Sequence, residues 1–355
     1  MSRFMYSRFQ KMEAYTPGEQ PRDKQYIKLN TNESPFSPAP QVIAAMNEGE
    51  VADLRLYPDP EGKVLKQKIA ALYGLESANI FLSNGSDDIL NFAFMAFRGV
   101  KGVTFPDITY GFYEVFAELH DIPTKIIPLC DDFTVDANAY MSDERMVVLA
   151  NPNAPTGISL TADAIEDILR ANPNNVVLID EAYVDFGGES CYPLIKRYDN
   201  LLVVRTFSKS RCLAGGRLGY AFGNAALIED LEKIRYSTNP YSINRLTLRL
   251  GEVTIDENDY YLEKCAEIVR VREWTSEQLT RLGFEVLKSD TNFLFARHAA
   301  VDGALLYQRL KDEGVLVRHF TKQRIAAFNR ITIGTAEQMQ RFIDIVTLLI
   351  KEQNV

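Results

Sequence analysis

The sequence predicts an α/β protein with a large domain built on a mainly parallel sheet and a smaller α+β domain. Between about residue 64 and residue 245, short apolar runs rich in β-branched residues alternate with segments of helical periodicity. Strands of this kind are buried on both faces of a parallel sheet, so helices are expected on each side. After about residue 245, long charged helical segments precede several strands, which is typical of a separate unit. A chain of 355 residues is also longer than one compact core usually fills.

The elements follow from these runs in chain order. Helical periodicity covers 61–75, a strand is expected at 79–83, and a helix at 85–97 has Ser86 and Asp87 in its first turn. Further strands of the large domain are expected in the segments GVTFP, TKIIPL, RMVVLA, NVVLID and NLLVVRT. The second domain is predicted to contain a long helix at 257–283, strands in FEVL, NFLFAR, VLVRHF and RITIG, and a closing helix.

Composition excludes several classes of function. A net charge of -9 without a long basic run argues against nucleic acid or an anionic membrane as partner. The N-terminus has no apolar core of signal-peptide length, and no segment approaches the roughly 20 apolar residues of a membrane span. We therefore expect a cytoplasmic protein. The cysteines Cys130, Cys191, Cys212 and Cys265 lie far apart and lack the spacing of a metal site. We therefore expect no metal site, and we expect all four thiols to be reduced.

The polar residues that suggest chemistry follow predicted strands. The segments are SNGSDD, NPNAPTG, DEAYVDF and TFSKS, and in a parallel sheet such strand ends meet at one edge, where ligands bind. Lys209 in TFSKS is placed to act as a nucleophile, which requires its ammonium group to lose a proton and which yields an imine with a carbonyl compound. A surface lysine flanked by serines is the alternative interpretation of this stretch alone.

A phosphate site is indicated near that lysine. Arg217 offers a bidentate cation, and the hydroxyl groups of Thr206 and Ser208 offer donors. The backbone N–H groups of Ser86 and Asp87 would point from a helix N-terminus toward an anion, although a simple helix cap would have the same sequence.

Asp180 ends a buried strand, where a carboxylate is costly without a partner. A pyridinium nitrogen is such a partner, and pyridoxal 5'-phosphate (PLP) takes an aspartate there. Asp180 could instead bind Mg²⁺ in a nucleotide-binding protein, but the G-x-x-x-x-G-K-[ST] sequence is missing. It could also be a capping carboxylate. Tyr183 is expected to reach the same cavity, and Asn153 either donates to a phenolate oxygen of the cofactor or only forms a turn.

Taken in order, these motifs resemble the fold type I PLP-dependent aminotransferases. Within that family the chain resembles the subgroup that transaminates histidinol phosphate, in the segments YTPGEQP, LNTNESPFSP, RLYPDPEG, SNGSDDIL, LANPNAPTG, DEAYVDF, RTFSKSRCLAGGRLGY and RITIGT. Ser34 and Gly216 depart from the subgroup's pattern. The resemblance implies a seven-stranded sheet in a large domain at 37–245, and a small domain formed by 1–36 and 246–355. It also implies a homodimer that uses PLP and transfers an amino group from histidinol phosphate to 2-oxoglutarate in histidine biosynthesis.

The resemblance also implies a role for each site residue. Lys209, Asp180 and Tyr183 would be catalytic, with Lys209 attached to the cofactor and Asp180 beside the pyridine nitrogen. Tyr183 and Asn153 would contact the ring oxygen and Tyr110 would stack on the ring. The phosphate would be held by Ser86, Asp87, Thr206, Ser208, Arg217 and, across a dimer interface, Tyr57. Arg330, Arg318, Tyr15 and Asn32 would bind the substrate, and the segment around Tyr15 would cover the partner's pocket.

Other functions are also compatible with parts of the sequence. An aromatic amino-acid aminotransferase or a threonine-phosphate decarboxylase would keep every cofactor residue and differ only at the substrate end. A nicotinamide-dependent dehydrogenase would have alternating strands and helices, but its G-x-G-x-x-G sequence is missing here. A non-catalytic binding protein on the same fold would not need Lys209, Asp180 and Arg217 together.

Overall fold

A seven-stranded sheet organises the larger part of the molecule. The computed structural model describes residues 2–13 and 15–353. The sheet order is β2-β8-β7-β6-β5-β3-β4, and all pairs are parallel except those of β8, which runs antiparallel to β2 and β7. The strands are β2 (Ile80–Ser83), β3 (Val103–Pro106), β4 (Thr124–Ile127), β5 (Met146–Ala150), β6 (Val177–Asp180), β7 (Leu201–Thr206) and β8 (Gly219–Gly223).

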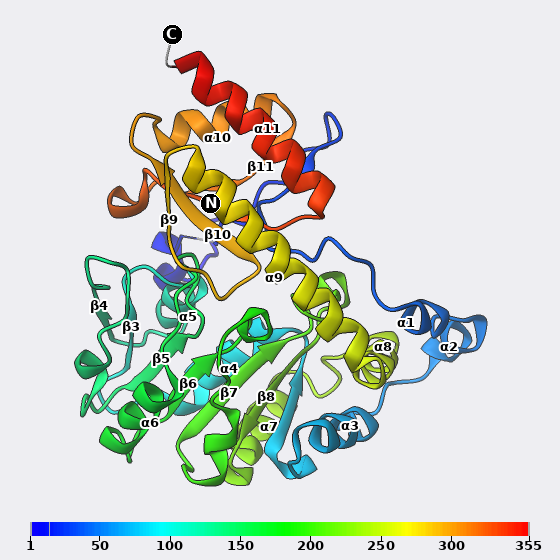
Figure 1. Ribbon diagram of the computed structural model, residues 1–355. Helices are drawn as coiled ribbons and strands as arrows, with labels where there is room; N and C mark the ends of the chain where they lie inside the picture. The colour runs from blue at the N-terminus through cyan, green and yellow to red at the C-terminus, as the bar shows by residue number, and fades with distance from the viewer. Residues whose placement is uncertain (1, 14, 354–355) are drawn as a thin grey trace.

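Helices cover both faces of this sheet (Figure 1). Side chains alternate between the two faces along a strand, so Val147 and Leu149 pack in one core and Val148 packs in the other. The core containing Val148 includes side chains of α4 (Ser86–Phe97), α5 (Phe112–Leu119) and α7 (Ala225–Thr238). The opposite core includes side chains of α3 (Lys63–Tyr73), α6 (Ala162–Ala171) and α8 (Arg245–Asp256). The predicted α/β fold class is therefore confirmed.

A second sheet forms the centre of the smaller part, at the top of Figure 1. Its order is β12-β13-β10-β9, with all pairs antiparallel. The elements are β9 (Phe284–Val286), β10 (Phe293–His298), α10 (Gly303–Asp312), β11 (Val315–Leu316), β12 (Arg318–His319), β13 (Asn329–Thr332) and α11 (Ala336–Gln353). The N-terminal strand β1 (Ile27–Lys28) pairs in parallel with β11, so the N-terminal segment joins the C-terminal part of the chain.

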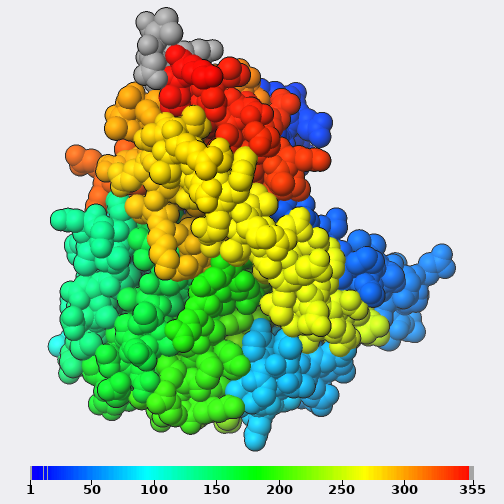
Figure 2. All heavy atoms as spheres, viewed as in Figure 1, coloured from blue at the N-terminus to red at the C-terminus, as the bar shows by residue number. Residues whose placement is uncertain are grey.

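The long helix α9 (Asn258–Arg281) connects the two parts and is drawn in yellow across Figures 1 and 2. The preceding helix α8 packs against α3, and its Leu248 and Ile255 belong to a core of the large sheet. This packing associates α8 with the large domain, beyond the predicted boundary at residue 245. The division at 37–245 stays a prediction.

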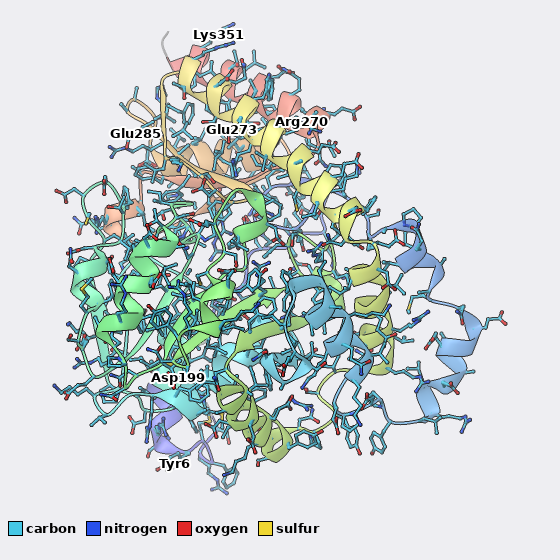
Figure 3. The ribbon with its side chains drawn as sticks, turned by 60° about the horizontal axis from the view of Figure 1, so that its bottom comes forward. Tyr6, Asp199, Arg270, Glu273, Glu285 and Lys351 are labelled. Carbon is cyan, nitrogen blue, oxygen red and sulfur yellow. The ribbon has the colours of Figure 1, made fainter. Side chains whose placement is uncertain are left out.

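Two short helices, α1 (Pro40–Ala44) and α2 (Glu48–Ala52), form an arm that projects from the body, in blue at the right of Figure 2. The first residues of the chain pack on the large domain, where Arg8 donates to the carbonyl oxygen of Leu119 at the end of α5 (2.8 Å). Tyr6 lies at the bottom of Figure 3 and Lys351, near the other end of the chain, lies at the top. Within the described ranges, no helix combines the length and the apolar character needed to cross a membrane.

Candidate active site

A cavity of about 340 Å³ lies at the carboxyl ends of β5, β6 and β7. Polar strand ends converge there because these neighbouring strands run in parallel. Nine residues predicted for the site line it: Ser86, Asp87, Tyr110, Asp180, Tyr183, Thr206, Ser208, Lys209 and Arg217.

One end of the cavity is suited to an anion. Helix α4 begins at Ser86, directly after Gly85, whose φ is +89°. Gly85 occupies the N-cap position and provides no side-chain hydrogen bond to the first N–H groups of the helix. A Cβ atom on Gly85 would stand 2.7 Å from the Arg217 Nη2 atom, so the guanidinium group lies directly beside this end of the helix. The helix N-terminus and the guanidinium group thus present positive charge to the same space.

Asp87 holds two other groups at this end. Its carboxylate accepts a 3.1 Å hydrogen bond from Arg217 and a 2.8 Å hydrogen bond from the Tyr110 hydroxyl. On the neighbouring loop the backbone N–H of Ser208 donates to the Thr206 hydroxyl (3.0 Å). Five of the six residues predicted to hold a phosphate therefore line this cavity: Ser86, Asp87, Thr206, Ser208 and Arg217.

Asp180 lies at the base of the cavity and is 5% exposed. The Tyr113 hydroxyl donates to its Oδ2 atom (2.9 Å), and the backbone N–H of Ala182 donates to its Oδ1 atom (3.1 Å). Burial raises the pKa of the Asp180 carboxyl group to about 6, while the hydrogen bond from Tyr113 opposes that rise. A cationic partner in the cavity would therefore be bound strongly by this carboxylate.

Lys209 follows β7 and extends into the cavity from the adjacent loop. Its ammonium group donates to the carbonyl oxygen of Thr31 (3.2 Å) and lies 5.8 Å from the centre of the Tyr183 ring. The Tyr183 hydroxyl accepts a 2.9 Å hydrogen bond from the amide of Asn32, whose Oδ1 atom accepts from Thr332 (3.0 Å). The N-terminal segment thus positions the lysine and the tyrosine together.

A second cavity of about 490 Å³ adjoins the first and shares Thr31, Tyr110, Ala154, Tyr183 and Lys209 with it. All four residues predicted to bind substrate line this cavity: Tyr15, Asn32, Arg318 and Arg330. The two arginines give it positive charge.

Local contacts also hold the other three of these side chains, in addition to those of Asn32 described above. Arg330 donates to the carbonyl oxygen of Asn30 (3.0 Å), and burial lowers the pKa of its guanidinium group. Arg318 is 3.5 Å from the carbonyl oxygen of Thr16. Tyr15 stacks on Phe112 (4.1 Å between ring centres) and lines the cavity of its own chain. Tyr15 thus contacts α5 of its own chain, and the expectation that this segment also covers the partner's pocket stays a prediction.

Two predicted residues do not line either cavity. Asn153 is 2% exposed, and its amide nitrogen donates to the carbonyl oxygen of Ile108 and to the Thr156 hydroxyl. A contact with the cofactor would require Asn153 to exchange one of these partners. Tyr57 is 78% exposed and stacks on Tyr241 (4.5 Å between ring centres), outside both cavities.

Sequence reasoning missed two contributors to the site. Tyr113 lies on the first turn of α5, three residues after Tyr110 in the segment TYGFY, which follows the predicted strand GVTFP and so leads to the same edge of the sheet. Thr31 contributes a backbone carbonyl group, for which residue type gives no indication.

The arrangement combines a lysine, a buried carboxylate and an anion site around one cavity. These groups fit a molecule that has a carbonyl carbon, a basic ring nitrogen and a phosphate. The adjoining arginines fit an anionic substrate.

Comparison with known proteins agrees with this chemistry. Residues 24–346 match the family model described as aminotransferase class I and II. The histidinol-phosphate aminotransferase of Brachyspira hyodysenteriae is 50% identical over 99% of this chain and 100% of its own length. That of a Marinomonas species is 49% identical over 96% and 97%. The Sinorhizobium meliloti histidinol-phosphate aminotransferase, solved in complex with pyridoxal-5'-phosphate, superposes with a TM-score of 0.84 at 25% identity, covering 93% of this chain and 92% of that one. This chain therefore belongs to the class I and II aminotransferase family.

Proposed function

We propose that this protein is a PLP-dependent enzyme that transfers the amino group of histidinol phosphate to 2-oxoglutarate, a step of histidine biosynthesis. The observation that carries the proposal is one cavity lined by Lys209, Asp180 and Arg217 that adjoins a second cavity lined by Arg318 and Arg330. Relatives that are 42–50% identical to this chain over nearly its whole length are named for this activity, which supports the choice of substrate.

The residues of the first cavity would hold PLP. Lys209 would carry it covalently, Asp180 would pair with the ring nitrogen, and Tyr110 would stack on the ring. The phosphate would bind at the N-terminus of α4, with Arg217 and the hydroxyl groups of Thr206 and Ser208 beside it. Arg217 and Asp87 already form an ion pair, so the arginine is held in place for that phosphate.

When bound, PLP withdraws electrons from the α carbon of the substrate. Asp180 would keep the ring nitrogen protonated, because a buried carboxylate strongly favours a cationic neighbour. The free amine of Lys209 would then remove the proton from the substrate's α carbon and return a proton as general acid. Tyr183, held by Asn32, would donate to the ring oxygen.

The second cavity would bind the anionic end of each substrate. Arg330 and Arg318 can contact the phosphate of the amino donor and a carboxylate of 2-oxoglutarate in turn, because a guanidinium group matches both. Tyr15 and Asn32 would form the wall beside them.

We also propose that the active form is a homodimer located in the cytoplasm. Tyr57 follows the projecting arm in the chain, and Val51 on α2 together with Leu54 and Leu56 are likewise exposed apolar side chains. An exposed apolar patch of this kind is typical of an interface, and a twofold dimer would bring Tyr57 to the partner's phosphate site. The four free cysteines are compatible with a reducing compartment.

A screen of amino donors in the half-reaction tests the function. Each donor is mixed with PLP-loaded protein while the absorbance of the bound cofactor is followed. We expect histidinol phosphate to give the highest kcat/KM. A higher value for phenylalanine would assign the enzyme to aromatic amino acids, and release of CO₂ from phosphothreonine would indicate a decarboxylase.

A further inference from the structure

Among the hydrogen bonds of the described residues, Tyr113 supplies the only one from a side chain to the Asp180 carboxylate. It is fully buried (0% exposed) at the start of α5, and its hydroxyl donates to the Asp180 Oδ2 atom over 2.9 Å. A donor that reaches a buried carboxylate stabilises the ionised form of that carboxylate. Tyr113 therefore acts on the charge of Asp180 from outside the cavity, because it does not line the cavity itself.

The same tyrosine supports a second wall of the cavity. Its ring meets the ring of Tyr110 edge to face, with 5.7 Å between centres and 87° between planes. Tyr110 in turn donates to Asp87, which binds Arg217. Contacts of Tyr113 thus connect the carboxylate at the base of the cavity with the anion site at its end.

We propose that Tyr113 is a positioning residue that keeps Asp180 ionised and aimed at the ring nitrogen of PLP, while its ring holds Tyr110 in place. The proposal rests on the proposed function for the identity of the cofactor. The contact between the two side chains exists independently of any cofactor.

The charges around Asp180 decide the expected pH dependence. Burial raises the pKa of Asp180 most strongly, and the negative charges of Asp87 on α4 and of Glu181, directly after β6, raise it further. Tyr113 and the N–H of Ala182 oppose these effects. Lys209, Arg217, Tyr110 and Tyr183 line the same cavity.

The direction of the pH dependence follows from the raised pKa of Asp180. Between about pH 4 and about pH 6 the aspartate of the unfolded chain loses its proton while Asp180 in the folded protein keeps it, so the free energy of unfolding decreases as pH rises through this range.

The test uses Tyr113→Phe, which removes the hydroxyl and keeps the ring against Tyr110. Without that donor the pKa of Asp180 rises further, so the variant loses more stability than wild type as pH increases. In cofactor-free protein we expect Tyr113→Phe to lower the folding equilibrium constant about tenfold more at pH 8 than at pH 5, the equivalent of one pKa unit. Thermal and urea unfolding at both pH values measure this difference.

Two further variants isolate the contact. Tyr140→Phe removes the hydroxyl of another buried tyrosine outside both cavities, and its effect should be equal at pH 5 and pH 8. In an Asp180→Asn background, Tyr113→Phe should lose its pH dependence. If Tyr113→Phe folds only in that background, the proposal is supported. A double variant that does not fold would overturn it, because the hydroxyl would then be needed for another reason.

Equilibrium dialysis against PLP at pH 6.5 gives the second readout. With a pKa one unit higher, about a quarter of Asp180 instead of about three quarters is ionised at that pH, so we expect Tyr113→Phe to raise the Kd for PLP about threefold, while Tyr140→Phe leaves it unchanged. Equal pH dependence of stability in Tyr113→Phe and Tyr140→Phe would overturn the proposal. If wild-type protein binds no PLP, the proposed function fails, and the stability comparison still tests the contact between Tyr113 and Asp180.

Discussion

The ammonium group of Lys209 donates a 3.2 Å hydrogen bond to the backbone carbonyl oxygen of Thr31, which lies 178 residues earlier in the chain. The N-terminal segment therefore holds the residue on which the proposed chemistry depends. Asn32, the next residue, binds the Tyr183 hydroxyl, so one short stretch positions two groups of the cavity.

Replacing Lys209 by alanine should abolish transamination and leave the fold intact. The lysine both carries the cofactor and moves the proton, so we expect turnover to fall at least 100-fold, within the roughly 10²- to 10⁴-fold contribution of acid–base catalysis alone. Steady-state rates and thermal unfolding measure the two effects. Lys196→Ala is the matched control, because Lys196 also donates to a backbone carbonyl group, that of Gly74, on the surface. Near-normal turnover in Lys209→Ala would contradict the assignment.

Arg330→Gln should raise KM for both anionic substrates. Loss of about 1.5 to 4 kcal/mol of charge-assisted binding corresponds to a roughly 10- to 1000-fold increase. Initial rates with histidinol phosphate and 2-oxoglutarate measure the change. An amino donor that has no phosphate or carboxylate group serves as the comparison. Arg297→Gln, which removes an exposed arginine from the adjacent strand β10, should leave KM unchanged. Equal losses with charged and neutral substrates would show that Arg330 does not recognise the anion.

Glu181→Gln should destabilise the fold by about 3 kcal/mol or more, because it leaves the Arg205 guanidinium group buried with a weaker partner. The side chains of Glu181 and Arg205 are 0% and 6% exposed, and two hydrogen bonds of 3.0 and 2.9 Å join them. Urea unfolding measures the loss. Asp167→Asn removes the partner of Arg170 in an exposed ion pair and should have little effect. Similar stability of the two variants would mean that the buried pair contributes little.

Mixing two inactive variants tests the shared site. After subunit exchange, a hybrid of Lys209→Ala with a Tyr57 variant of severely weakened cofactor binding contains one intact and one doubly damaged site if Tyr57 serves the partner. Random exchange of equal amounts should then restore up to about a quarter of wild-type activity, since half of the dimers are hybrids with one good site. Native mass spectrometry confirms that hybrids form. Hybrids without activity would show that Tyr57 serves its own chain.

Much of the large domain follows from local sequence. Buried parallel strands are short runs of β-branched residues, so NVVLID and NLLVVRT were recognisable and their ends located Asp180 and Lys209. Strand β8 was not recognised, because GYAFG contains two glycines and lacks that composition. Gly219 is needed there because a Cβ atom would stand 2.5 Å from the backbone nitrogen of Ser86.

Contacts between distant segments could not be predicted. The position of the Asn153 amide depends on a hydrogen bond to Ile108, 45 residues earlier, and the position of Tyr15 depends on stacking against Phe112. Neither contact leaves a pattern in the local sequence. The pairing of β1 with β11 is similarly a tertiary result, since a two-residue strand has no period of its own.

Borohydride reduction followed by peptide mass mapping tests the central claim most directly, because reduction fixes PLP covalently on the lysine that carries it. Purified protein is incubated with PLP, reduced, digested and analysed for a peptide that has gained the mass of the reduced cofactor. The account predicts one labelled peptide, which contains Lys209. A label on a different lysine, or no label after addition of PLP, would contradict it.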